Sequence, residues 1–369
     1  MAKFPEGQGH SLKTSRRLLW GLGLLLLVVG GFWLWVYWPS GQSSTKPAPP
    51  RDETAYPPPQ HVPSIDPPGR SIPLAGAPES CDGSDAPDTA AAVNAASLST
   101  LAWTPFGKPE TGWEIYAPRI AAEIGTTCGP GSNGFASALA RWQGAHGLQA
   151  TGVVDPAVFG AMLVRWHLAR PFVRTNREGI CPGAPPEANL GLAKPEESYG
   201  GKAIRMRPGA LAAYRNMVAE ARAAGALTKP DALKIFSGFR APDADAQRCA
   251  RDKNCQGLIR TICSAHRTGL AMDVVIDAAP GFRPDSSADA NRLAMARSPL
   301  FRWMVVNASR FGFVNYAYEP WHWEWTGEPL LPGVPISSLP QDGSEPATEP
   351  QPDSISGTPA APAGARNRR

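Results

Sequence analysis

The order of apolar and polar positions divides the chain into an apolar segment, a proline-rich stretch and two folded units. Residues 18–38 contain no charged side chain. As a helix that rises about 1.5 Å per residue, this segment is about 30 Å long, which is enough to cross a bilayer. Its C-terminal end is rich in aromatic residues, as membrane interfaces favour: Trp33, Trp35, Tyr37 and Trp38. The pattern predicts one transmembrane helix.

Basic residues before this segment indicate its orientation, because Lys and Arg are retained on the cytoplasmic side. Residues 1–17 are therefore predicted to be cytoplasmic. A cleaved signal peptide is the alternative, but the apolar run is long and the following "WPSGQSS" is a poor cleavage site. We expect a single-pass anchor in the inner membrane of a double-membraned bacterium, with the rest of the chain in the periplasm, or on the outer side of another cell.

Two segments are predicted to be connectors rather than folded units. Residues 39–78 hold twelve prolines and favour an extended polyproline II stalk, with a reach of up to roughly 120 Å. Residues 334–369 are rich in Pro, Ser, Gly and Ala and are predicted to be disordered.

The first folded unit, residues 79–178, shows three amphipathic helical patterns, at 112–125, 134–148 and 155–168. The third begins with Asp155, a good N-cap, and Pro156, which suits the first helical turn. We expect a small all-α three-helix domain.

The second unit, residues 179–333, mixes both periodicities. Helices are predicted at 208–224 and from Ser298 to about 310, and strands at 232–239, 270–276 and 321–326. In the last strand Trp321, Trp323 and Trp325 alternate with His322 and Glu324, so each set occupies its own face. The prediction is an α+β domain with a small, largely antiparallel sheet.

Charge and cysteine content narrow the class of protein. A net charge of +4 without a long basic stripe gives no indication of nucleic-acid binding. The six cysteines suit an oxidising compartment. Cys81–Cys128 is the pairing expected in the first unit. The other four cysteines leave the connectivity open, with Cys249–Cys255 and Cys181–Cys263 weakly preferred.

The chemistry is predicted to lie in the second unit, whose only histidines are His266 and His322. A catalytic zinc site takes three protein ligands and keeps one position open, and His266, Asp273 and His322 supply two nitrogens and an oxygen. Glu319, three residues before the last ligand, is the candidate general base. Glu324 is equally consistent with a partner of His322 and with a solvated strand residue.

Part of the first unit resembles the peptidoglycan-binding-like domain. The matching features are Trp142-Gln143, Gly147-Leu148 and the loop from Gly152 to Pro156. The resemblance implies a module that docks on the cell wall, although some members only pack against a neighbouring domain.

The second unit resembles the zinc D-alanyl-D-alanine carboxypeptidase family, which includes vancomycin-resistance carboxypeptidases and dipeptidases and is related to Hedgehog zinc domains. The family motif S-x-H-x-x-G-x-A-x-D is met by Ser264, His266, Gly269, Ala271 and Asp273. The motif E-P-W-H is met by Glu319 to His322, and S-G-[YF]-R by Ser237 to Arg240.

The resemblance implies roles for these residues. His266, Asp273 and His322 would bind Zn²⁺, Glu319 would be the catalytic base, Arg240 would face the substrate, and Ser264 would contact the bound peptide. The family often carries a Gln about five residues after the Arg. Here Gln247 comes seven residues after Arg240, so the loop that contributes to substrate choice is altered.

These features together predict a membrane-anchored periplasmic zinc carboxypeptidase that removes the terminal D-Ala from peptidoglycan stem peptides. An endopeptidase with the same site is one alternative. A non-enzymatic wall-binding protein with a structural zinc is another, although such a site would not need Glu319.

Overall fold

The computed structural model of the protein describes residues 80–82, 88–253, 255 and 261–339. The predicted cytoplasmic N-terminus, membrane anchor and stalk (1–78) lie outside these residues, as does the tail from residue 340. Within the described ranges, no helix is both long enough and apolar enough to span a bilayer.

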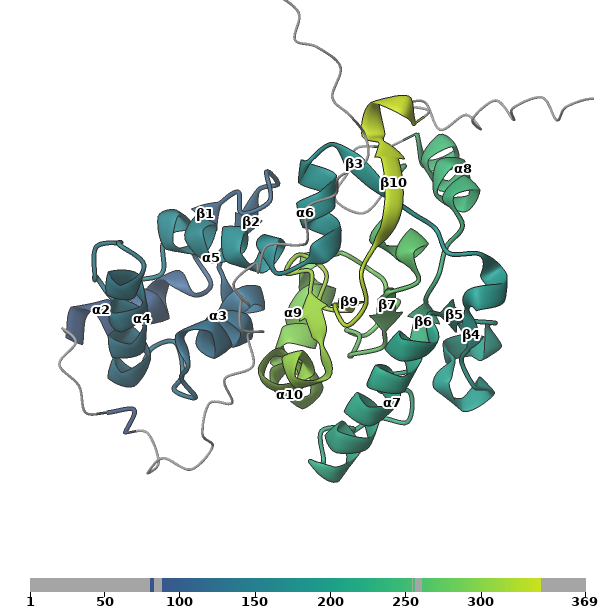
Figure 1. The fold of residues 1–369 in the computed structure, drawn as a ribbon. Helices are drawn as coiled ribbons and strands as arrows, with labels where there is room; N and C mark the ends of the chain where they lie inside the picture. The colour runs from purple at the N-terminus through teal and green to yellow at the C-terminus, as the bar shows by residue number, and fades with distance from the viewer. Residues whose placement is uncertain (1–79, 83–87, 254, 256–260, 340–369) are drawn as a thin grey trace, which may run out of the picture. The chain divides into compact units, whose positions relative to one another are not determined.

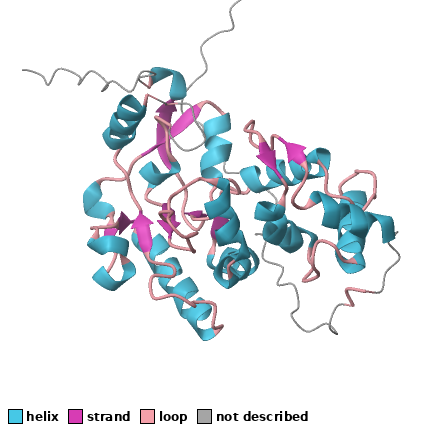
Figure 2. Ribbon diagram, turned by 180° about the vertical axis from the view of Figure 1, so that it is seen from behind, coloured by secondary structure: helices cyan, strands magenta, loops and turns pink. Residues whose placement is uncertain are grey.

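The helical unit, residues 80–178, contains more elements than the three predicted helices (Figures 1 and 2). Its helices are α2 (Asp88–Ser97), the 3₁₀ turn η1 (Glu114–Tyr116), α3 (Ala117–Ile124), α4 (Asn133–Ala145), α5 (Pro156–Leu168) and α6 (Pro171–Arg177). Strands β1 (Ala102–Trp103) and β2 (Glu110–Thr111) form a short antiparallel pair. The prediction of an all-α three-helix domain was therefore wrong in detail.

Local sequence explains which of these helices were predictable. Ser132 accepts a hydrogen bond from the amide of Phe135 and begins α4, and Asp155 does the same for Val158 at the start of α5. α2 escaped notice because its buried apolar positions are small, namely Ala90 and Ala91, which pack on Ala136, and its other buried residue, Asn94, is polar. Alanines give almost no apolar periodicity, so only tertiary packing shows which face is buried.

The sheet unit, residues 179–339, has the predicted α+β architecture. Its central sheet is antiparallel, in the order β6 (Ile235–Ser237), β7 (Ala271–Val274), β9 (His322–Trp325) and β8 (Phe313–Asn315). Two smaller pairs join β4 (Gly191–Leu192) to β5 (Arg205–Met206), and β3 (Ile180–Gly183) to β10 (Leu331–Pro335). The helices are α7 (Pro208–Ala223), α8 (Pro242–Asp252), α9 (Asp289–Arg297) and α10 (Pro299–Asn307). Short 3₁₀ turns are η2 (Glu187–Asn189), η3 (Pro195–Glu197), η4 (Tyr199–Gly201), η5 (Ala265–Thr268), η6 (Ala308–Phe311) and η7 (Ile336–Ser338).

One face of the central sheet packs against α7, α9 and α10 to form the core. Met272 and Val274 of β7 join Trp321 and Trp323 in this cluster, and Trp325 packs at its edge. The predicted alternation of β9 is confirmed, because His322 and Glu324, which lie between these tryptophans, face the opposite side of the sheet.

Three finer expectations need correction. The segment 241–255 contains helix α8 rather than a loop. β10 and η7 continue through the predicted end of the domain at residue 333, so the first residues of the predicted tail are structured. Of the disulfides, Cys81–Cys128 and Cys181–Cys263 are confirmed, but the structure does not join Cys249 to Cys255.

A buried ion pair connects the two units. The guanidinium of Arg292, on α9, lies 3.0 Å from Glu110 and donates to the hydroxyl of Tyr116 at 2.6 Å. Its Nε donates to the carbonyl of Tyr318 at 2.9 Å, and its side chain has no exposed surface. A second pair between the units, Arg297 with Glu114, is largely exposed.

Glu110→Gln should lower the free energy of unfolding by about 3 kcal/mol, because it removes the buried counter-charge of Arg292 and leaves only the half-exposed Asp289, at 3.2 Å. Glu114→Gln, in the exposed pair, is the matched control and should cost less than about 1 kcal/mol. Chemical denaturation of both variants measures the difference. Equal losses of unfolding free energy in the two variants would mean that burial does not make the pair of Arg292 and Glu110 more important for stability.

Candidate metal centre

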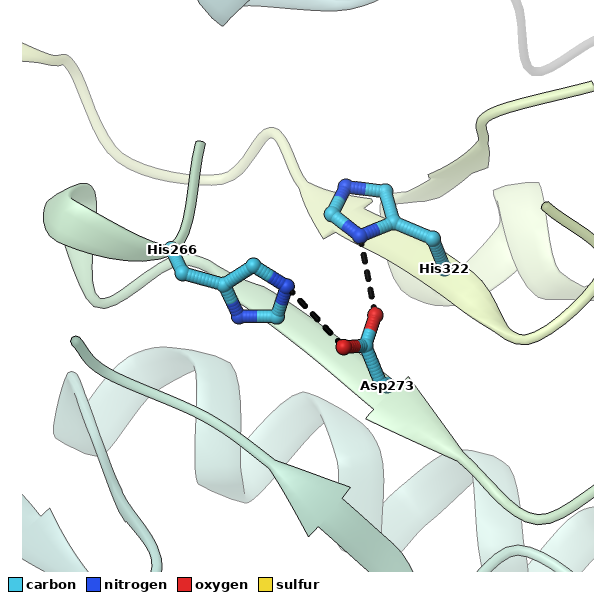
Figure 3. A group of neighbouring side chains, drawn as sticks. All are labelled: His266, Asp273 and His322. Carbon is cyan, nitrogen blue, oxygen red and sulfur yellow. Dashed lines mark hydrogen bonds and ion pairs between the residues drawn. The ribbon is translucent and has the colours of Figure 1, made fainter. Parts of the chain in front are cut away.

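Three side chains predicted to bind metal converge on one point (Figure 3). The carboxylate of Asp273 lies between the two imidazoles: its Oδ2 is 3.1 Å from Nε2 of His266, and its Oδ1 is 2.9 Å from Nδ1 of His322. The potential ligand atoms all lie within 4.8 Å of one another, and all three residues are buried. This spacing suits a single ion held by two nitrogens and one oxygen.

The sheet and one short turn create this arrangement. Asp273 and His322 are directly opposite in the register of β7 and β9. His266 lies in η5, which begins where Ser264 accepts a hydrogen bond from the amide of His266. The turn ends at Gly269, whose φ of 68° is in the left-handed region that favours glycine. Gly269 thus lets the chain turn between His266 and β7.

The hydrogen bonds of the outer nitrogens direct the inner nitrogens at the metal position. Nδ1 of His266 is 2.7 Å from the carbonyl oxygen of Gly238, which can only accept, so Nδ1 carries the proton and Nε2 has a free lone pair. Nε2 of His322 lies 3.1 Å from a carboxylate oxygen of Glu324, which leaves Nδ1 as the ligand atom. Glu324 is therefore a partner of His322 and not a solvated strand residue.

Burial and mutual contact shift the pKa values of this cluster in different directions. Burial lowers the pKa of His266. The two imidazoles, through charge and hydrogen bonding, outweigh burial at Asp273 and hold its pKa far below the usual range. Burial opposes the charged form of His322 as well, but hydrogen bonds to Asp273 and Glu324 outweigh it and raise the pKa to about 9.

Glu319 lies beside the cluster without joining it. Its carboxylate is 4.0 Å from Nδ1 of His322, and burial raises its pKa to about 7. The turn that carries it is held by Asn315, which donates to the carbonyl oxygens of Glu319 at 3.1 Å and His322 at 2.8 Å. A carboxyl group with a pKa near neutrality at this place has the properties of a general base.

The predicted substrate residues are only partly assembled. Arg240 donates to Ser264 at 3.4 Å and to Ser237 at 3.2 Å, but its closest partner is the buried carboxylate of Asp245, at 2.9 Å. Gln247 is exposed on α8 and does not reach this group. Residues two apart on a helix point about 200° apart, so with Asp245 turned inward, Gln247 must face outward.

Two contributors to the site were not predicted. Asp245 lies five residues after Arg240, where the family often carries its Gln. This spacing was the signal that could have identified Asp245. Arg170 comes from the helical unit and pairs with Glu324. No local pattern marks Arg170, because it lies 154 residues from its partner.

Comparison with known proteins agrees with the sequence resemblance. Residues 203–328 match the family model described as D-alanyl-D-alanine carboxypeptidase, VanY, and residues 125–162 match that of a peptidoglycan binding domain. No curated protein matches the chain. Among solved structures, one match is a mutant of vancomycin resistance D,D-pentapeptidase VanY from a VanB-type cassette, in complex with Zn(II). It is 18% identical, covers 42% of this chain and 85% of that one, and has a TM-score of 0.23.

One segment of the chain thus matches a VanY-type carboxypeptidase domain, and a segment before it matches a peptidoglycan-binding domain. This match agrees with the predicted carboxypeptidase class. The roles of individual residues stay predictions.

Zinc binding at about pH 8 should release about one proton from His322. Its pKa of about 9 means that the metal-free ring is protonated there, whereas a metal ligand must be neutral. Zinc affinity should accordingly fall as the pH is lowered below 9. Calorimetry in buffers of different ionisation enthalpy counts the protons, to which a zinc-bound water with a pKa of about 7 would add up to one more.

The double variant His266→Ala/His322→Ala is the control and should bind no zinc at this site. A binding heat that does not depend on the buffer would contradict the assignment of His322 as a ligand.

Proposed function

We propose that this protein is a membrane-anchored, zinc-dependent D-alanyl-D-alanine carboxypeptidase that removes the terminal D-Ala from peptidoglycan stem peptides in the periplasm. The observation that carries the proposal is the convergence of His266, Asp273 and His322, with Glu319 beside them, inside the segment that matches the carboxypeptidase family.

The donor set fits zinc. Two imidazole nitrogens and one carboxylate oxygen are typical of catalytic zinc, which keeps a fourth position for water. His266 would bind through Nε2, His322 through Nδ1, and Asp273 through its carboxylate. When bound, zinc lowers the pKa of a water ligand to about 7 and polarises the carbonyl to be cleaved.

Glu319 would move the proton in this reaction. Its carboxylate would accept a proton from the attacking water and then donate it to the leaving amine of D-Ala. Burial supports this role, because a pKa of about 7 lets the group take and return a proton near neutral pH. A purely structural zinc site would not need a buried carboxyl group that can exchange a proton beside the ligands.

Arg240 would bind the substrate. Its planar guanidinium suits either the terminal carboxylate or the oxygen that becomes negative during attack. Ser264, within 3.4 Å of it, would contact the peptide. Arg267, the next arginine along the motif, is less suited to this role, because it is buried and its Nη1 contacts Cys181 of the disulfide.

The remaining segments support a location at the cell wall. The apolar segment 18–38 would anchor the chain in the inner membrane. The proline-rich segment 39–78 would let the two folded units reach peptidoglycan, on which the peptidoglycan-binding domain would dock.

One observation favours an endopeptidase as a second candidate. Asp245 offsets the charge of Arg240, which weakens the demand for a free carboxylate on the substrate. A crosslink cut at an internal peptide bond has no such carboxylate, so its binding would depend less on the charge of Arg240.

Glu319→Gln should keep zinc and the fold while lowering turnover about 10²- to 10⁴-fold, the usual contribution of acid–base catalysis. Metal analysis and circular dichroism verify the first two properties, and hydrolysis of a D-Ala-D-Ala peptide gives the third. Glu220→Gln, on the outer part of α7, is the control and should behave like the parent. Parental turnover in Glu319→Gln would require another base.

The full chain should release a single alanine from pentapeptide muropeptides, and a chelator should stop the reaction. Penicillin should not inhibit it, since no serine nucleophile takes part. Mass spectrometry of the digest identifies the products. Cleavage of crosslinked dimers alone, with pentapeptide monomers untouched, would support the endopeptidase.

A further inference from the structure

We propose that the helical unit completes the metal centre, with Arg170 and Glu324 acting as positioning residues for the ligand His322. The inference rests on the proposed zinc site and deepens it. It gives the helical unit a part in the chemistry that is separate from binding the cell wall.

The first step is the contact between Glu324 and His322. Both belong to β9 and, being two residues apart, face the same side of the sheet. Oε1 of Glu324 is 3.1 Å from Nε2 of His322, the nitrogen that faces away from Asp273. A carboxylate here accepts the Nε2 proton, which fixes both the tautomer and the plane of the ring.

The second step is the contact between Arg170 and the same oxygen. Nε of Arg170 donates to Oε1 of Glu324 at 2.8 Å, and Nη2 also bonds to that atom. The guanidinium stacks over the ring of Tyr316, with 4.4 Å between its central carbon and the ring centroid. With two donors and one flat surface, Arg170 holds the carboxylate of Glu324 in one orientation.

Local sequence explains how Arg170 reaches the site. It lies between α5 and α6, and Pro171 begins α6. A residue before proline is disfavoured in the helical region, and Arg170 has the extended angles φ −89° and ψ 113°. The helices therefore break at Arg170, whose side chain leaves the helical unit.

The helical unit holds the same catalytic segment at further points. Arg119 of α3 donates to Asn315 at 3.4 Å, and Asn315 in turn holds the carbonyl groups of Glu319 and His322. The buried pair of Arg292 with Glu110 fixes the carbonyl of Tyr318, the residue before Glu319. Arg292 itself belongs to α9 of the sheet unit, so the helical unit supports this segment through Arg119 and through Glu110, which binds the guanidinium of Arg292.

Stability alone is a poor reason for the pair of Arg170 and Glu324. Their side chains are 8% and 4% exposed, and desolvation cancels much of the attraction between two buried charges. Other ion pairs also join the units, and one of them, Arg297 with Glu114, is 58% and 29% exposed and touches no residue of the metal centre. Docking of the two units is therefore possible without a contact at His322.

The test measures zinc affinity of the full chain by competition with a chromophoric chelator. Arg170→Met and Glu324→Gln should each weaken zinc binding about 10- to 100-fold, the range found when a partner of a metal-ligating histidine is removed. Arg170→Lys keeps the charge and should recover part of the loss. The double variant should be little worse than either single one, because both residues act through His322.

Arg297→Met is the matched control, since it removes a pair between the units away from the metal, and it should bind zinc like the parent. Thermal unfolding of the metal-free variants separates positioning from general stability. If Arg170→Met does not fold, the zinc affinity of Glu324→Gln, which keeps the side-chain volume, tests the inference.

Parental zinc affinity in folded Arg170→Met and Glu324→Gln would overturn this inference and leave the proposed function intact. An equal loss in Arg297→Met would overturn it as well, since it would indicate a general effect of docking. A parent chain that binds no zinc would instead overturn the proposed function itself.

Discussion

The antiparallel pairing of β7 with β9 is the constraint on which the candidate site depends. Asp273 and His322 are opposite each other only in this register. Their neighbours Met272 and Trp323 belong to the core on the other face of the sheet. A slip of one residue would exchange the two faces and bury the ligands among apolar side chains. Packing on one face therefore fixes the geometry of the metal ligands on the other.

Burial of so many charged groups is sustained because most of them compensate one another. Asp273 lies between two imidazoles, and Glu324 lies between His322 and Arg170, which lowers its pKa to about 2. Glu319 differs, since its nearest cation is 4.0 Å away and its pKa rises to about 7. A buried carboxyl group whose charge is left poorly stabilised is typical of a catalytic acid or base. Thus the same buried environment keeps Asp273 and Glu324 ionised and leaves Glu319 able to exchange a proton.

Sequence predicted the features that depend on neighbours in the chain. The caps Ser298 and Asp155, the alternation of β9 and the spacing of His266 from Asp273 all follow from local rules, and the structure agrees with them. Helix α8 was missed because its sequence is mostly polar and charged, so its single buried face produces little apolar signal. Gln247 was chosen because the family carries a Gln in this segment, but the helix instead turns Asp245 towards Arg240.

Residues that connect the two units could not have been predicted from either unit alone. Arg170 lies between the segments that match the two families, 125–162 and 203–328, and Glu110 lies before both. A family match describes what a domain keeps in many different proteins. Arg170 and Glu110 lie outside both matched segments, yet their contacts reach the strand and turn that carry His322 and Glu319. The boundary between domains in the sequence is therefore not a boundary of the site, whose ligands lie in one unit and whose support comes from both.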